Sequence, residues 1–314
     1  MWQELRVPRE AAGQRLDVWL AAALGCTRSL VQRLLDDGRC AIYPGKARAG
    51  RSLTGGELVS IEVPEVEPAS VEPEDIPLSV LHEDEHLLVV DKPAGMVVHP
   101  AIGHTRGTLV NALLWRWPDA RSGGEAWRPG LVHRLDAETS GVICVARSAE
   151  ALAFLQAAFA ERRVRKQYLA LCAGRPRADV LRCEAPIGRD PRDFRKRAVR
   201  RLGEGEAREA ETLFLVRARG DGYSVVEARP RTGRTHQIRV HLAHLGHPVL
   251  ADPLYGRSRT WPPGLADGAP GLRRHALHAW RLVVPHPRGG ELVCTAPLPA
   301  DLQPWVPAGL EPLA

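Results

Sequence analysis

Hydrophobic and polar positions in the first sixty residues alternate with the periods of two short helices and two strands. Apolar residues at spacings i, i+3, i+4, i+7 and i+8 predict one amphipathic helix, and they are Leu16, Trp19, Leu20, Ala23 and Leu24. Thr27 can cap a second helix, whose apolar stripe runs from Leu30 to Leu35 and which ends near Gly38. Short strands are expected at 40–42 and 58–63.

From residue 80 onward the pattern is mainly that of strands. Apolar runs predict strands at 87–90, 142–146, 167–173, 211–216 and 223–228. Helices are expected after Ser148 and Thr235, each of which can cap a helix, and Gly246 can end the second one. Because strands mostly follow one another, we expect an α+β domain built on a mainly antiparallel mixed sheet with flanking helices.

An acidic, proline-rich segment separates these two regions. Between Arg51 and Lys92 there is no lysine or arginine, but there are eleven aspartates and glutamates. Four prolines interrupt any helix or inner strand there, namely Pro64, Pro68, Pro73 and Pro77. We therefore expect a small N-terminal α+β domain at 1–62, a linker at 63–80 that phosphate would avoid, and a larger domain at 81–314.

The chain has 314 residues, a net charge of +6 and 44% hydrophobic residues, which is an ordinary globular composition. Only four of its 43 basic residues are lysines. Arginine binds phosphate bidentately, so this balance favours a polyanionic partner, although an arginine-rich chain is equally typical of a GC-rich genome. The start has no signal pattern and no apolar run is long enough to span a membrane, so we expect a cytoplasmic protein without membrane contact.

Several common types of site are absent from the sequence. There is no P-loop, dinucleotide-binding glycine motif, H-E-x-x-H or G-x-S-x-G. The six cysteines lie far apart, so we expect buried thiols and neither a zinc ribbon nor a disulfide framework. His241, His244 and His247 spread around a predicted helix end, which is poor geometry for a metal. We expect no metal and no cofactor.

The polar segment 130–141 is the strongest candidate for chemistry. His133, Arg134, Asp136, Thr139 and Ser140 fall in a predicted loop beside an apolar strand, where a rigid sheet can direct side chains into a cleft. Spacing alone favours a simpler interpretation, because an aspartate near threonine and serine is more often a turn former than a catalytic group.

Six motifs in order along the chain resemble those of the RluA-type pseudouridine synthases. One of them is His133-Arg134-Leu135-Asp136-x-x-Thr139-Ser140-Gly141. The others are D-K-P-A-G-x-V-V-H-P at 91–100, K-Q-Y-L-A at 166–170, G-R-T-H-Q-I-R-V-H at 233–241, D-P-L-Y-G at 252–256 and A-P-L-P at 296–299. The resemblance covers about residues 80–302 and implies conversion of uridine in RNA to pseudouridine without a cofactor.

The resemblance also implies roles for individual side chains. Asp136 would be the nucleophile, since a carboxylate can attack either the anomeric carbon or the pyrimidine ring and leave again; the carbon attacked stays open. Arg239 would pair with Asp136 and keep it ionised. Tyr168 would lie against the uracil face. Ile238 would pack behind the base, or it is an ordinary core residue.

Other residues of the same motifs would bind the RNA. A stacked or paired uridine must turn outward, and Arg134 could occupy the vacated space or hold the backbone. His133 and Thr139 are further substrate-binding candidates. Basic runs at 162–166 and 195–201 could bind phosphates, although solvated loops are an equal alternative for the second run.

The first domain resembles the small RNA-binding domain first seen in ribosomal protein S-four. The likeness rests on R-L-D at 15–17, T-R-S-L-V-Q at 27–32, G-R at 38–39, G-K at 45–46 and G-G-E at 55–57. It implies RNA contacts by Arg28, Arg33 and Lys46. Solvated surface charge is the alternative for these three residues.

These resemblances together predict a monomeric RNA-uridine isomerase. The first domain and the His99-Pro100 region look most like the RluD branch, which modifies large-subunit ribosomal RNA, so we expect ribosomal RNA or an assembling large subunit as the partner. Three alternatives stay open: a synthase acting on transfer RNA, an RNA-binding protein without isomerase activity, and a glycosidase that releases the base.

Overall fold

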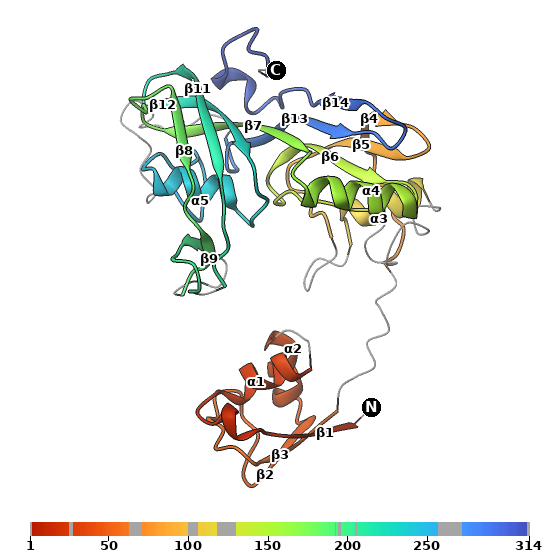
Figure 1. Cartoon of the computed structure of the whole chain (residues 1–314), viewed down its shortest axis with the longest axis vertical. Helices are drawn as coiled ribbons and strands as arrows, with labels where there is room; N and C mark the ends of the chain where they lie inside the picture. Colours follow the sequence, from red (N-terminus) through yellow and green to blue (C-terminus); the bar gives the residue numbers. More distant parts are fainter. Residues whose placement is uncertain are drawn as a thin grey trace. The chain divides into compact units, whose positions relative to one another are not determined.

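The computed structural model divides into two compact units, Met1–Ala69 and Ser70–Ala314 (Figure 1). The residues that it describes are 2–24, 28–62, 71–99, 106–117, 130–191, 193, 196–204, 206–256 and 272–312. The expected cap Thr27 and residues 63–70 of the predicted linker lie outside these ranges.

The first unit contains two helices and a three-stranded antiparallel sheet. Helices α1 (Leu16–Ala23) and α2 (Arg28–Asp36) confirm both predicted helices, and Gly38 follows α2 with a φ of 72°. The sheet has the order β1-β3-β2, with strands β1 (Trp2–Arg6), β3 (Leu58–Glu62) and β2 (Cys40–Tyr43). A short 3-10 helix, η1, spans Arg9–Ala11.

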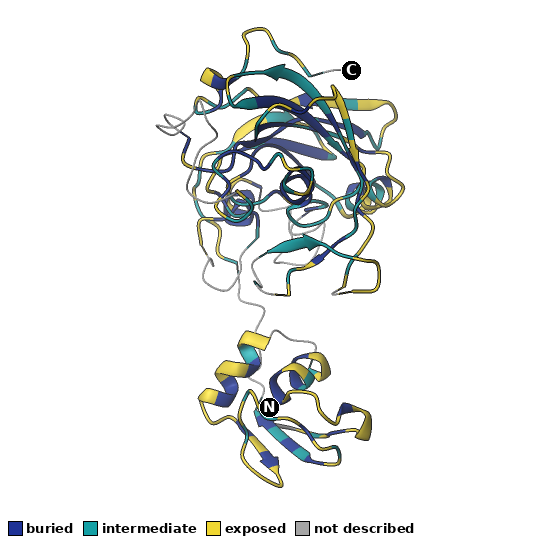
Figure 2. Ribbon diagram, turned by 90° about the vertical axis from the view of Figure 1, so that its left-hand side faces the viewer, coloured by how far each residue is buried: buried dark blue, intermediate teal, exposed yellow. Residues whose placement is uncertain are grey.

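The apolar stripes of both helices form the core of this unit with the sheet. Leu16, Leu20 and Val31 are fully buried, as are Val59 and Ile61 of β3, and all five belong to one cluster. Figure 2 shows buried and exposed residues interspersed along the helices of this unit. The helix spacing in the sequence therefore identified the buried face of α2 and most of that of α1, but Ala23, which was expected on the face of α1, is exposed.

One nine-stranded sheet forms the centre of the second unit. Its strands are β4 (Ser79–Glu83), β5 (Leu87–Lys92), β6 (Ser140–Ala146), β7 (Arg165–Ala173), β8 (Val180–Cys183), β11 (Thr212–Arg219), β12 (Tyr223–Pro230), β13 (Leu277–Pro285) and β14 (Glu291–Thr295). They follow the order β4-β5-β6-β13-β7-β12-β11-β8, with β14 paired to β13. Among these strands only β13 and β6 pair in parallel, which confirms the predicted α+β class with a mainly antiparallel mixed sheet.

Among the described residues, three α-helices and one small hairpin accompany this sheet. They are α3 (Leu109–Arg116), α4 (Ala149–Ala160), α5 (Gln237–His244), and the hairpin of β9 (Ile187–Arg189) with β10 (Arg197–Val199). Helix α4 contacts β6 and β13, whereas α5 contacts β10, β11 and β12. A 3-10 helix, η3 (Gln303–Trp305), lies near the C-terminus of the chain.

The two predicted helix caps of this unit have different outcomes. Ser148 caps α4 by accepting the backbone N–H of Ala151 at 3.1 Å, as predicted. The predicted Thr235 cap of α5 is wrong, because His236 occupies the N-cap position with a φ of 58°. The turn is closed instead by the side chain of Gln237, whose Oε1 accepts the backbone N–H of Arg234 at 2.9 Å.

Residues 71–78, which fall within the segment expected to be a linker, lie against α3. The Nδ2 of Asn111 donates to the carbonyl oxygen of Glu72 at 2.7 Å, and the N–H of Glu74 donates to the carbonyl oxygen of Asn111 at 3.0 Å. Val71 and Ile76 pack on the apolar cluster that α3 shares with the sheet. This stretch therefore belongs to the second unit.

Burial acts on the pKa values of several described histidines of the second unit. Burial lowers the pKa of His133 to about 3, and it lowers those of His275 and His278 to about 4. The described cysteines are also buried, and none is in a disulfide. No helix within the described ranges is long and apolar enough to cross a membrane.

We predict that the second unit loses stability as the pH falls from about 6.5 to about 4. In the unfolded chain these histidines take up protons near pH 6.5, whereas in the folded protein they stay neutral to lower pH. Each histidine's contribution to the free energy of unfolding is therefore fully present above pH 6.5 and is lost below it, by up to about 3 kcal/mol per residue. Urea denaturation at pH 7.5 and pH 5 measures this loss. His278→Gln should reduce it, and the exposed control His244→Gln should not. Equal wild-type stability at both pH values would contradict the prediction.

Candidate active site

The loop at 130–139 carries Asp136 to the start of β6. A buried lysine at the end of β5, Lys92, fixes this loop. Its ammonium donates hydrogen bonds to three backbone carbonyl oxygens, those of Ala137 (2.9 Å), Pro93 (2.8 Å) and Met96 (2.8 Å). Because all three N–H donors are used, the backbone directly after Asp136 is locked to the loop that follows β5.

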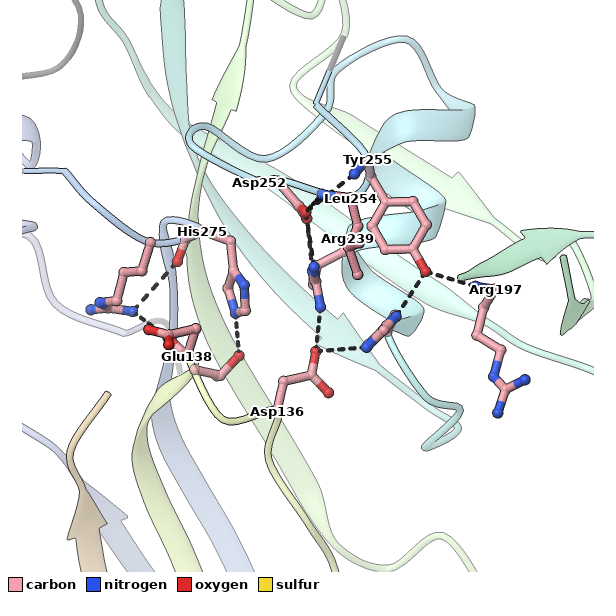
Figure 3. A network of polar contacts seen from close by, with 11 residues as sticks. Asp136, Glu138, Arg197, Arg239, Asp252, Leu254, Tyr255 and His275 are labelled. Carbon is pink, nitrogen blue, oxygen red and sulfur yellow. Dashed lines mark hydrogen bonds and ion pairs between the residues drawn. The ribbon is translucent and has the colours of Figure 1, made fainter. Parts of the chain in front are cut away.

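The segment before β13 holds the same loop through side chains (Figure 3). The Nε2 of His275 and the Oγ1 of Thr139 share a hydrogen bond of 2.7 Å, and the Nη1 of Arg274 donates to the carbonyl oxygen of Glu138 at 2.9 Å. Burial and the charge of Arg239 keep the pKa of His275 low, so its ring is neutral near pH 7. Glu138 itself is exposed.

A single guanidinium joins Asp136 to a second carboxylate. Arg239, on α5, donates from Nη1 to Oδ2 of Asp136 at 2.9 Å. Its other two nitrogens donate to Asp252 as a fork, from Nε to Oδ2 at 2.7 Å and from Nη2 to Oδ1 at 2.8 Å. The N–H groups of Leu254 and Tyr255 also donate to Oδ1 of Asp252. The expected pairing of Arg239 with Asp136 is therefore present.

Burial distinguishes the two carboxylates of this network. Burial alone would raise the pKa of Asp252, but Arg239 holds it below its usual range. Burial would likewise lower the pKa of Arg239, but Asp252 and Asp136 raise it. The side chains of Asp252 and Arg239 are 0% and 4% exposed, whereas that of Asp136 is 19% exposed. Asp136 is therefore the reachable end of a chain of two negative charges and one positive charge.

Asp136 faces a cavity of about 590 Å³. Its lining includes Arg134, Asp136, Tyr168, His236, Ile238 and Arg239. Cavities of this size are typical of sites that enclose a small organic group. The loop before β6, strand β7 and helix α5 thus bring together residues that are separated by about a hundred positions in the sequence.

Tyr168 and Ile238 give the cavity its less polar wall. Ile238 is 6% exposed, and Tyr168 is partly buried between the two main apolar clusters of the sheet. Burial, together with the charge of Asp136, raises the pKa of Tyr168. Its hydroxyl is therefore protonated at neutral pH, and its ring offers a face on which a planar base can stack.

The remaining candidates of the loop differ in what they contact. His133 accepts the backbone N–H of Cys144 at 2.9 Å and stacks on Phe159, so its ring has a structural contact although it also lines the cavity. Thr139 is buried and bonded to His275. Arg134 is exposed and lines the cavity, in a position to meet a ligand that enters it.

The basic run at 162–166 is divided between ion pairs and the cavity. Arg163 pairs with Glu161 and Arg165 with Glu291. Lys166 donates to the carbonyl oxygen of Thr232 and lines the cavity together with Arg162.

Arg28, Arg33 and Lys46 belong to the first unit, whereas the residues that line the cavity belong to the second. Arg28 pairs at 2.6 Å with Asp17, a fully buried carboxylate that Arg15 also binds. Arg33 and Lys46 are exposed. Part of the charge at Arg28 is therefore used within the domain, while Arg33 and Lys46 present theirs to solvent.

Neither of two histidine clusters within the described residues is arranged to bind a metal. His241, His244 and His247 do not converge, because His241 bonds Thr212 and Ala185, His247 bonds Ala173, and His244 is exposed. The side chains of His82, Asp84 and His286 do converge. However, Nδ1 of His286 accepts the N–H of Arg288, so its Nε2 carries the proton and donates to Asp84. That arrangement leaves no lone pair on Nε2 for a metal.

A family model described as RNA pseudouridylate synthase matches residues 86–244. This range contains Asp136, Tyr168 and Arg239, and it covers half of the chain. The chain belongs to the RNA pseudouridylate synthase family. The predicted resemblance is confirmed, and the protein is an RNA pseudouridine synthase.

Full-length relatives and solved structures agree with the assignment to the synthase family. The chain is 44% identical to ribosomal large subunit pseudouridine synthase D of Xanthomonas campestris, over 95% of this chain and 89% of the relative. It is 40% identical to the protein of the same name from Nitrosomonas europaea, over 95% and 85%. The structure of human RNA Pseudouridylate Synthase Domain Containing 1 matches with a TM-score of 0.56 and 32% identity, covering 74% of this chain and 87% of that one.

Several residues of the synthase site were not singled out from the sequence. Lys92, His236, Asp252, Tyr255 and His275 all contact the network around Asp136 or its loop. Four of them lie inside motifs that carried the family resemblance, which was the available signal. His275 lies outside those motifs, and nothing in its spacing indicated a contact with Thr139.

We predict that Asp252→Asn lowers the free energy of unfolding of the synthase, because Arg239 loses a charged partner. The amide keeps one acceptor but loses the charge and the fork, so a buried guanidinium is left poorly paired, at a cost of about 3–5 kcal/mol. Urea denaturation measures this loss. Asp301→Asn, which breaks the partly exposed pair with Arg274, is the control and should cost less. Equal losses of unfolding free energy in the two variants would contradict the prediction that the fully buried Asp252 matters more for stability than Asp301.

Proposed function

We propose that this synthase isomerises uridine in large-subunit ribosomal RNA with Asp136 as the nucleophile. The observation that supports this chemistry best is the exposed end of the Asp252–Arg239–Asp136 chain in a cavity of about 590 Å³. The carboxylate is held at 2.9 Å by the guanidinium of Arg239, a donor that keeps its positive charge at neutral pH.

The reaction requires a group that attacks and then leaves. In pseudouridine formation the bond between N1 of uracil and C1′ of ribose breaks, the ring turns, a bond forms between C5 and C1′, and the C5 proton moves to N1. No atom is gained or lost. We propose that an oxygen of Asp136 attacks either C1′ or the pyrimidine ring and is displaced when the new bond forms.

The other cavity residues serve the same sequence of steps. We propose that Tyr168 stacks on the uracil face and that Ile238 packs behind the base. Arg239 orients Asp136 and neutralises its charge in part when the carboxylate departs. Extrusion of a uridine from a helix leaves a gap, and the exposed Arg134 at the cavity fills it or binds the backbone. His133 and Thr139 would complete the substrate-binding wall.

The ribosomal target follows from the relatives and from the first unit. Three relatives at 40% identity or more are named for the large ribosomal subunit. The first unit presents Arg33 and Lys46 to solvent, and we propose that these two residues and Arg28 bind phosphates of the RNA. We further propose that the synthase works as a monomer in the cytoplasm, where this RNA is assembled into subunits.

We predict that Asp136→Asn removes product formation and leaves RNA binding intact. The amide keeps the shape of the carboxylate but not its nucleophilic charge, so turnover should fall by on the order of 10³-fold or more. In a deletion strain, wild-type protein should restore pseudouridine at positions of large-subunit RNA, as mapped by mass spectrometry, and the variant should not.

Glu138→Gln is the matched control, because this exposed carboxylate lies two residues away on the same loop. It should restore modification as the wild type does. Modification by the Asp136 variant would refute the nucleophile. Lost modification only in transfer RNA would refute the ribosomal target, and release of free uracil would indicate a glycosidase.

We predict that the double change Arg33→Ala and Lys46→Ala weakens RNA binding mainly at low salt. Each removed phosphate contact should lower the slope of log affinity against log salt by about 1. Filter binding between 50 and 300 mM salt measures the slope. Gln32→Ala, an exposed uncharged position on the same helix as Arg33, should leave it unchanged. An unchanged slope in the double variant would mean that the RNA phosphates bind to other residues.

A further inference from the structure

His236 lies beside the proposed nucleophile, but neither the sequence motifs nor the proposed mechanism gives it a task. Its side chain is 16% exposed and lines the cavity. Its Nε2 lies 3.9 Å from Oδ2 of Asp136, which is too far for a hydrogen bond. The imidazole and the carboxylate therefore face the same space without using each other, and an atom of a bound substrate can approach both.

Tyr255 determines which ring nitrogen of His236 carries the proton. The Tyr255 hydroxyl accepts the backbone N–H of Arg197 at 2.8 Å and lies 2.7 Å from Nδ1 of His236 (Figure 3). A phenol has one proton to donate, and among the described residues the structure gives it no acceptor other than Nδ1. Nδ1 is therefore the acceptor in this bond, which leaves the imidazole proton on Nε2.

The charges around the ring agree with this neutral tautomer. Burial lowers the pKa of His236; the charges of Asp136 and Asp252 oppose this, while those of Arg239 and Arg197 reinforce it. Burial raises the pKa of Tyr255 to about 12, so its hydroxyl keeps the proton that it donates. The negative charge of Asp136, 3.9 Å from Nε2, also favours a proton on that nitrogen.

We propose that the Nε2–H of His236 is a hydrogen-bond donor to a carbonyl oxygen of the uracil while the base is detached from its ribose. This inference rests on the proposed function of the cavity. When the bond between C1′ and N1 breaks, its electron pair leaves with the ring and spreads onto O2 and O4. A donor aimed at one of these oxygens stabilises that charge. No proton is transferred, and the imidazole is unchanged when the bond to C5 forms.

The same contacts connect the donor to the basic β9–β10 hairpin. Arg197 is the first residue of β10, and its backbone N–H begins the series Arg197, Tyr255, His236. Arg239 also stacks over the Tyr255 ring at 5.1 Å. Tyr255 therefore holds both the proposed donor and the partner of Asp136, and it is a positioning residue in this scheme.

Single-turnover measurements with excess protein separate the chemical step from RNA binding. His236→Leu removes the donor and should slow the step by about 100-fold, while the dissociation constant for RNA changes less than about threefold. His236→Gln places an amide N–H near the position of Nε2 and should recover at least about tenfold of that loss. His244→Leu, an exposed histidine at the end of the same helix, should match the wild type.

Tyr255→Phe tests the positioning role without removing the ring over Arg239. Nitrogen-15 spectra of protein labelled in histidine should show His236 as the Nε2–H tautomer in the wild type and as a mixture in Tyr255→Phe, whose rate falls by less than in His236→Leu. The tautomer seen in these spectra tests the proposal even if His236→Leu does not fold.

Three results would overturn the inference. They are a wild-type rate in His236→Leu, a loss confined to RNA affinity, or an Nδ1–H tautomer in the wild-type spectrum. A wild-type protein that forms no pseudouridine would instead reject the proposed function, so the two failures are distinguishable.

Discussion

The buried guanidinium of Arg239 is the interaction on which the site depends. It is nearly inaccessible, and it is satisfied only when Asp252 accepts two of its hydrogen bonds and Asp136 accepts a third. A buried charge is stable only with such partners. The pairing therefore fixes where α5 lies relative to the loop before β6, and it keeps one carboxylate at the surface of the cavity. The fold and the chemistry share this contact.

Two other buried cations repeat the same principle around the loop. Lys92 binds three carbonyl oxygens, and Arg274 binds Asp301, the carbonyl oxygen of Glu138 and the hydroxyl of Ser140. Each cation comes from a different part of the chain, and each donates hydrogen bonds to residues shortly after Asp136. The loop is thus fixed from several sides by charge-assisted bonds. Such preorganisation suits a nucleophile that must meet a base extruded from RNA.

The sequence predicted well what depends on local pattern. Apolar periodicity identified α1, α2, β5 and β6, and the family motifs brought Asp136, Tyr168 and Arg239 together before the cavity was known. The sequence did not predict features that depend on contacts between residues far apart in the chain. Strand β13 was missed, and the Nδ1 of its buried His278 bonds Ser140 of β6, a partner that lies far away in the sequence. Likewise, no cap rule indicates that His236 would occupy the N-cap of α5 with a positive φ.

A structure of the Asp136→Asn variant bound to substrate RNA would test the central claim most directly. The account predicts an extruded uridine in the cavity, with its uracil on Tyr168 and with C1′ or a ring carbon about 3–3.5 Å from the substituted side chain. A uridine that stays stacked in its helix, or that binds away from the Asp252–Arg239 pair, would contradict it.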